Sequence, residues 1–208
     1  MKNEHEQLQS FLTIESQELQ NFTQHMDYTQ LIAAKELIVH AQQQKNRVHV
    51  TGIGKPGHVA GYIASLLSST GTPAYELHGT EAVHGSSGQV QEGDIVIAIS
   101  NSGETEELKA TIQTLKQNGA KIISVSGNQE SWLAKAGDVS LFAGVTHEGD
   151  TLNKPPRSSI LAEIIVLQCL SVLLQYEKNL DPTQYVKWHP GGSLGKGIKE
   201  TMKEGKSI

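Results

Sequence analysis

Residues 94–108 read DIVIAISNSGETEEL, and the change of pattern along them is the strongest indication of the fold. Residues 94–100 are apolar almost throughout, as is typical of a strand covered on both faces in a parallel sheet. Residues 104–118 then repeat apolar side chains at helical spacing, through Leu108, Ile112 and Leu115. A buried strand that runs directly into a helix indicates an α/β protein.

The same alternation continues along most of the chain. We expect further strands at residues 47–52, 73–77, 121–127 and 138–143, and further helices at residues 54–71 and 158–177. Such alternation predicts a parallel five-stranded sheet with right-handed crossovers. The 158–177 segment is apolar nearly all the way round, so we expect that helix to be buried, either within the fold or against a second subunit.

Two helices are expected before the first strand, at residues 4–24 and 28–45, because apolar residues recur there near helical spacing. No linker, repeat or low-complexity run interrupts residues 47–195. We therefore predict an N-terminal helical extension, residues 1–45, that packs on one domain formed by residues 46–208.

Composition limits the class of protein. The formal net charge of the 208 residues is -5, which argues against a nucleic-acid partner. The stretch MKNEHEQLQSFL lacks the apolar core of a signal peptide, and no 18-residue apolar run occurs, so we expect a soluble, cytoplasmic protein with no membrane partner. The single cysteine, Cys169, lies in an apolar run and is expected in the core rather than as a reactive thiol.

Two loops at strand ends contain glycines, and ligands of such sheets gather there. The first, TGIGKPGH at residues 51–58, fits G-x-G-x-x-G, and Glu76 resembles the ribose-binding acid of a dinucleotide site. We disfavour a dinucleotide, because residues 128–208 are too short and too helical to form the further substrate domain that such an enzyme needs.

The second loop, SNSGET at residues 100–105, predicts an anion site. Backbone amides at a helix N-terminus attract an anion, and Ser100, Ser102 and Thr105 add hydroxyl donors, while Gly103 permits close approach of the backbone. The alternative is that Ser102 or Thr105 only caps the helix. Capping needs one hydroxyl, so three in six positions favour the terminal phosphate of a small molecule.

Acids and bases elsewhere in the predicted loops are candidates for general acid–base chemistry. At the start of a helix, Glu107 also fits a structural role, because the helix dipole favours acids there. His147 and Glu148 do not form an H-E-x-x-H site, since residue 151 is threonine, and the nine histidines show no ligand pattern, so we expect no metal. The candidates in this set are Lys55, His84, Glu107, Glu148 and His189.

Four motifs, in this order and spacing, resemble those of a sugar isomerase (SIS) domain: TGIGKPGHVA, ELHGTEAVHGSSGQV, GDIVIAISNSGETEEL and HPGGSLG. Within that family they are most similar to the arabinose-5-phosphate isomerases of the KpsF/GutQ type, from about residue 30 to residue 198. The resemblance implies a doubly wound, flavodoxin-like sheet. It also implies interconversion of D-arabinose 5-phosphate and D-ribulose 5-phosphate without a cofactor, by a homo-oligomer, a dimer of dimers whose pockets borrow residues from a neighbouring chain.

Matched position by position, the resemblance assigns catalytic roles to Lys55, His84, Glu107, Glu148 and His189. We expect Glu148 to move the proton between C1 and C2 through a cis-enediol, the two histidines to move protons among oxygens, and Lys55 to stabilise charge. His189 is a candidate to act in the pocket of a neighbouring chain. Substrate binding is expected from Gly54, Ser100, Asn101, Ser102, Gly103 and Thr105.

Two departures from the family pattern bear on these expectations. Members of this type usually carry a pair of CBS domains after the SIS domain, and the sequence ends at Ile208, so we expect no regulation through them. The family's APTSST run is KPPRSS here, at residues 154–159, which leaves open the exact sugar and whether Arg157 reaches the substrate or faces water. The alternatives are a non-catalytic sugar-phosphate sensor and a related enzyme such as 6-phospho-3-hexuloisomerase.

Overall fold

The structure is a computed structural model that describes residues 3–191. Its core is a five-stranded sheet in the order β2-β1-β3-β4-β5, and every neighbouring pair of strands is parallel. This is the flavodoxin-like order, in which ligands bind where the order reverses, between β1 and β3. The predicted doubly wound sheet is therefore confirmed. The strands are β1 Val48–Gly52, β2 Ala74–Glu76, β3 Ile95–Ile99, β4 Lys121–Ser126 and β5 Val139–Phe142.

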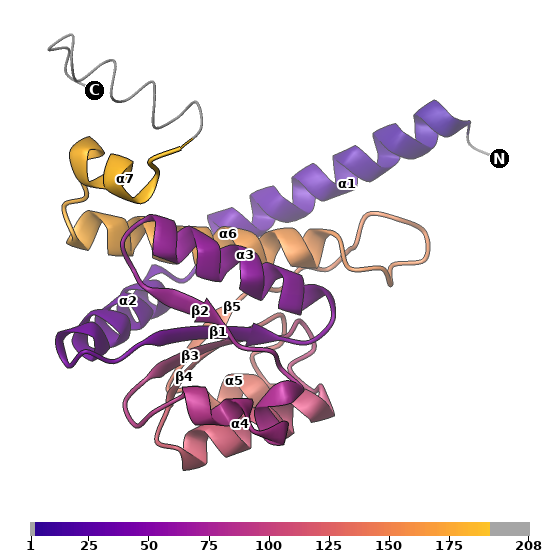
Figure 1. Cartoon of the computed structure of the whole chain (residues 1–208). Helices are drawn as coiled ribbons and strands as arrows, with labels where there is room; N and C mark the ends of the chain where they lie inside the picture. The colour runs from indigo at the N-terminus through magenta and orange to yellow at the C-terminus, as the bar shows by residue number, and fades with distance from the viewer. Residues whose placement is uncertain (1–2, 192–208) are drawn as a thin grey trace, which may run out of the picture.

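Helices cover both faces of the sheet, with α2, α3 and α6 on one face and α4 and α5 on the other (Figure 1). The alternation of β3 explains the two layers, because Ile95, Ile97 and Ile99 join one buried cluster and Val96 and Ala98 join the other. The α-helices are α1 Glu4–Gln24, α2 Tyr28–Gln43, α3 Lys55–Ser69, α4 Glu106–Gln117, α5 Trp132–Ala136, α6 Ser158–Glu177 and α7 Pro182–Trp188, and the 3₁₀ helices are η1 Glu81–His84 and η2 Ser86–Gln89.

The bounds of the longest elements were predictable, and those of the short ones were not. Helices α1 and α6 have the bounds expected from sequence. The helix expected at residues 28–45 ends at Gln43, and Lys45 has a left-handed φ of 65° that terminates it. Four short helices, η1, η2, α5 and α7, were not expected, because each is too short to display a helical period.

Helix α6 packs against α1, α2 and α3. Within residues 3–191 it is the one helix long and apolar enough to pass a length-and-composition test for a membrane span, and 50% of the window that passes is buried inside the fold. The expectation of burial is thus confirmed for half of this surface, while Val172 remains 63% exposed and Tyr176 82% exposed. Cys169 packs against the core, and burial raises the pKa of its thiol, as expected for an unreactive cysteine.

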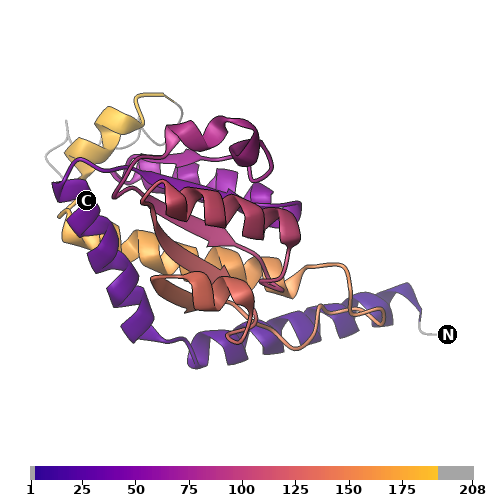
Figure 2. The same ribbon diagram turned by 90° about the horizontal axis from the view of Figure 1, so that it is seen from below.

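Helix α1 projects well beyond the body of the protein (Figures 1 and 2). Phe22, near its C-terminal end, is its one buried residue, and Leu8 and Leu12 are 64% and 60% exposed. The end of α1 nearest the body contacts α6. The division into an extension of residues 1–45 and a domain of residues 46–208 stays a prediction, and residues 192–208 lie outside the described part of the chain.

Candidate active site

The loop at residues 100–105 joins β3 to α4 and is tightly folded on itself. The Ser100 hydroxyl accepts a hydrogen bond from the Gly103 N–H at 3.2 Å and lies 3.3 Å from the Thr105 hydroxyl. Gly103 has a φ of 66°, and a side chain there would collide with the Ser131 hydroxyl. Only glycine satisfies both constraints, so the loop can turn sharply while its hydroxyl groups stay close together.

These hydroxyl groups do not cap α4. Thr105 occupies the N-cap position, but its side chain makes no capping hydrogen bond. The Ser102 hydroxyl accepts a bond from the Glu104 N–H at 3.2 Å, and Glu104 precedes the helix. Helix capping therefore does not account for the three hydroxyls, which bond within the loop and lie where a ligand at the start of α4 could use them.

A cavity of about 280 Å³ joins this loop to the residue expected to act as the base. Four of the predicted binding residues, Ser100, Asn101, Ser102 and Thr105, line it together with Glu148. Its volume lies just below the usual range for ligand pockets, about 300–1,000 Å³, which suits a metabolite of a few carbon atoms. The other lining residues are Ile53, Pro56, Lys154, Pro156, Ile160 and Glu163.

Glu148 lies in the loop between β5 and α6, and only 8% of it is exposed. Its Oε2 accepts hydrogen bonds from the backbone N–H groups of Arg157 at 2.6 Å and Ser159 at 3.2 Å, so the carboxylate caps the start of α6. Its own N–H donates to Asn153 Oδ1 at 2.6 Å. Both bonds that the carboxylate accepts within residues 3–191 are made by Oε2.

Helix α1 holds this loop from the outside. The Glu18 carboxylate accepts a hydrogen bond from the Thr146 N–H at 2.8 Å, and the Glu15 carboxylate accepts one from the Ser158 hydroxyl. The ring of Phe11 occupies the space where a side chain at Gly149 would lie. The position of Glu148 thus depends on residues more than a hundred positions earlier in the chain.

The structure explains where the charged residues of the KPPRSS stretch, residues 154–159, lie. The Arg157 guanidinium pairs with Asp150 at 2.7 Å and lies 6.0 Å from the centre of the Phe11 ring. It therefore neither reaches the cavity nor simply faces water, the two options that the sequence left open. Lys154 is the cation of this stretch that lines the cavity.

Two ionisable residues of the cavity, Lys154 and Glu163, were not among the candidates from sequence. Lys154 lies in the same KPPRSS stretch as Arg157. Glu163 is fully buried in α6, and its signal was a lone carboxylate inside the apolar run ILAEIIVL. A buried acid in an apolar helix is rare unless it is paired or functional.

Three of the predicted catalytic residues do not line this cavity. Lys55 begins α3, His84 ends η1 and Glu107 lies in the first turn of α4, and all three side chains are exposed. Lys55 adjoins Pro56, which does line the cavity. Their catalytic roles stay predictions.

The fourth, His189, lies at the opposite end of the sheet. Its ring stacks on Tyr185 at 4.0 Å, and the neighbouring Trp188 occupies the space beside Gly71, just beyond α3. The cavity lies near the first residues of α3, and 15 residues of helix span about 22 Å. Within one chain His189 is therefore remote from the cavity. Of the HPGGSLG motif, residues 192–195 lie outside the described part of the chain.

The first glycine loop forms a separate cavity of about 190 Å³. Gly52, Gly54, Gly57 and Glu76 line it, so the residues of the dinucleotide motif do meet. Gly54, a predicted substrate-binding residue, has a left-handed φ of 68° and belongs to this cavity rather than to the one beside Ser100. Its volume lies below the usual range of ligand pockets, about 300–1,000 Å³.

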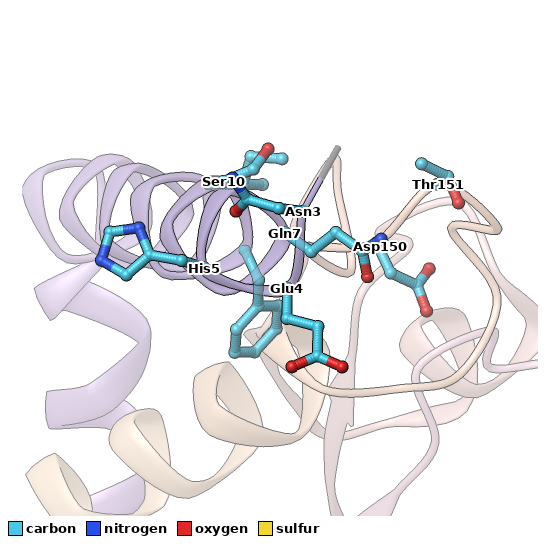
Figure 3. Close-up of a pocket in the computed structure, with 10 residues that line it drawn as sticks. Asn3, Glu4, His5, Gln7, Ser10, Asp150 and Thr151 are labelled. Carbon is cyan, nitrogen blue, oxygen red and sulfur yellow. The ribbon is translucent and has the colours of Figure 1, made fainter. Parts of the chain in front are cut away.

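A larger hollow of about 1190 Å³ lies between the first turns of α1 and residues 149–151 (Figure 3). Asp150 and Thr151 form one side of it, and His5 points away from them. None of the predicted site residues lines this hollow, so its large volume does not identify it as the active site. Within residues 3–191, no three or more His, Cys, Asp or Glu side chains are grouped to hold a metal ion.

A doubly wound parallel sheet with a small cavity at its switch point, where proteins of this fold hold their ligands, defines the class of this α/β protein. The profile of the SIS domain family matches residues 42–173, and the chain belongs to that family.

Known proteins with similar sequences and structures agree with this assignment. The chain is 41% identical over 154 residues to arabinose 5-phosphate isomerase KdsD of Pseudomonas aeruginosa, covering 74% of this chain and 47% of that protein. A protein of E. coli CFT073, solved in complex with arabinose 5-phosphate, is 33% identical with a TM-score of 0.81, over 91% of this chain and all of that one. A putative sugar-phosphate isomerase of Listeria monocytogenes is 27% identical with a TM-score of 0.84, over 92% and 100%. The chain spans about half the length of the curated relatives it matches.

Proposed function

We propose that this protein is an aldose–ketose isomerase that interconverts D-arabinose 5-phosphate and D-ribulose 5-phosphate. The observation that carries the proposal is the cavity of about 280 Å³ in which the hydroxyl-rich loop and Glu148 face the same space. A phosphate held by the hydroxyls and amides of residues 100–105 would leave the other end of a short sugar beside a carboxylate. Aldose–ketose isomerisation needs such a base next to C1 and C2.

The relatives support the choice of sugar. The matched proteins of Pseudomonas aeruginosa and E. coli are named arabinose 5-phosphate isomerases, and the structure at 33% identity contains arabinose 5-phosphate. These names belong to the relatives, and we extend them to this chain because the loop and the glutamate that the reaction needs line one cavity here.

In the proposed mechanism, Glu148 takes a proton from C2 of the aldose and returns it to C1 through a cis-enediol, while the proton of the C2 hydroxyl passes to O1. Its Oε1 would do this work, while Oε2 stays fixed by the amides of Arg157 and Ser159. Positive charge near the enediolate would come from Lys154, which lines the cavity, and from Lys55 at the start of α3.

The remaining predicted groups are proposed to act across a subunit boundary. His84 and Glu107 are exposed, and His189 is about one helix length away from the cavity in its own chain. We infer a homo-oligomer in which a neighbouring chain brings a histidine to the pocket. We also infer a cytoplasmic location, because a charged sugar phosphate crosses a lipid bilayer poorly.

The test is NMR of the protein with a panel of aldose and ketose phosphates in deuterated water. Interconversion of the arabinose and ribulose phosphates with deuterium entering at C1 or C2 is expected. Turnover of only a hexulose phosphate would reassign the substrate. Binding of sugar phosphates without any exchange would contradict the enzyme and favour a sensor.

A further inference from the structure

The carboxyl group of Glu163 is buried without a partner. The residue is 0% exposed, and neither Oε1 nor Oε2 has a hydrogen-bond partner within the described residues. The large majority of buried side-chain polar atoms in folded proteins have such a partner. Leaving one unpaired destabilises the fold, so a carboxylate in this position calls for an explanation beyond packing.

The position of Glu163 beside the cavity offers an explanation for its burial without a partner. It lines the same cavity as the 100–105 loop and Glu148. Ser159 lies one helical turn earlier on the same side of α6, and its hydroxyl is also buried without a partner within residues 3–191. Ser159 and Glu163 thus form a polar strip on a helix that is otherwise apolar, beginning where Glu148 caps α6.

The charges around Glu163 favour its neutral form. Burial, and to a smaller extent the negative charge of Glu148, raise the pKa of Glu163 to about 8. Lys154 is the cation that lines the same cavity. The helices packed against α6 bring groups that are engaged elsewhere: Glu15 of α1 with Ser158, Lys35 of α2 with Glu36 and Glu177, and the Tyr62 hydroxyl of α3 with Gln168.

We propose that Glu163 is a substrate-binding residue that, as a neutral carboxyl group, donates a hydrogen bond to an oxygen at the sugar end of the ligand. This inference rests on the proposed function and names the residue that binds the sugar end of the ligand in the same pocket. A neutral carboxyl donates from one oxygen and accepts at the other, so it matches a hydroxyl or carbonyl group of an aldose or ketose. An ionised carboxylate at this place would lose the donor and add a second negative charge beside Glu148.

Binding measurements with the full chain test the role. Calorimetry gives dissociation constants for D-arabinose 5-phosphate and for inorganic phosphate at pH 7 and pH 9. Glu163→Gln keeps a neutral donor, whereas Glu163→Met keeps the length of the side chain and removes the donor. Glu177→Gln, at the other end of the same helix, is the matched control because Glu177 pairs with Lys35 far from the cavity.

The wild type is expected to bind the sugar phosphate about tenfold more weakly at pH 9 than at pH 7, because the neutral fraction of Glu163 falls as pH passes about 8. Glu163→Gln should lose this pH dependence and keep the affinity measured at pH 7. Glu163→Met should bind the sugar phosphate about tenfold more weakly at pH 7 and inorganic phosphate as well as the wild type. The control should behave as the wild type.

Two outcomes overturn the inference. One is that Glu163→Met and Glu163→Gln bind the sugar phosphate as the wild type does at both pH values. The other is that Glu163→Met weakens both ligands equally, which would mark a structural role. A wild type that binds inorganic phosphate but no pentose phosphate would instead contradict the proposed function, so the two failures are distinguishable.

Discussion

The two walls of the cavity are built in different ways. The 100–105 loop is fixed mainly by backbone bonds to its neighbours: Ser100 N–H to the Val125 carbonyl at 3.0 Å, and Leu133 N–H to the Gly103 carbonyl at 3.1 Å. The loop that carries Glu148 is fixed largely by side chains, which come from α1, from Asn153 and from Arg157. Sheet topology therefore sets the first wall, whereas single substitutions can move the second.

The largest effect is expected at the second wall, from Glu148→Gln. The amide oxygen can still accept from the N–H groups of Arg157 and Ser159, so the fold is kept while the base is lost. We expect the rate of isomerisation to fall by roughly 10²–10⁴ with little change in sugar-phosphate affinity. Steady-state kinetics with calorimetry measure both. Glu104→Gln, on the first wall but outside the cavity, is the control, and full activity of Glu148→Gln would reassign the base.

The substitution Glu163→Gln is expected to change how the free energy of unfolding depends on pH. The pKa of Glu163 is raised above its ordinary value of 4.5 to about 8, so the cost of burying this group is smallest below about pH 4.5 and grows as the pH rises to about 8. The free energy of unfolding of Glu163→Gln should therefore exceed that of the wild type by an amount that grows to a few kcal/mol between pH 5 and pH 8. Urea denaturation across this range measures it, and a pH-independent difference would contradict a neutral buried acid.

A smaller effect is expected from the first wall, with Thr105→Val. The backbone that shapes the loop is kept, and one hydroxyl donor toward the ligand phosphate is removed. The Michaelis constant should rise about tenfold with kcat nearly unchanged. Ser102→Ala should act in the same direction. An unchanged Michaelis constant in both variants would remove these hydroxyls from the phosphate site.

The smallest effect is expected from Glu18→Ala, which frees the Thr146 N–H and loosens the attachment of the Glu148 loop to α1. Because Glu148 is still held by α6, we expect kcat to fall only about threefold, with the Michaelis constant unchanged. Gln17→Ala, exposed on the same turn of α1, is the matched control. If kcat/KM falls further in Glu18→Ala than in Thr105→Val, the second wall depends on α1 more than on α6.

The fold and the first wall could be predicted because both are local in sequence. The apolar period of each strand and helix can be read within that segment, and the glycine and hydroxyl spacing of the first wall lies within residues 100–105. The second wall could be predicted only at Glu148. Whether Arg157 or Lys154 faces the cavity depends on Asp150 and Phe11, and no local pattern encodes that choice. A role for Glu163 in the cavity could not be predicted, because the sequence places it in a helix without showing which neighbours surround its side chain.

The packing of Trp188 beside Gly71 has a consequence for how the protein behaves at low concentration. It anchors the C-terminal histidine of each polypeptide at the amino ends of the strands, while that polypeptide's own pocket opens at their carboxyl ends. If His189 takes part in turnover, a dissociated subunit carries every piece of the machinery but cannot bring the pieces together. Activity per milligram should then fall on dilution, and the midpoint of that fall would report the assembly equilibrium.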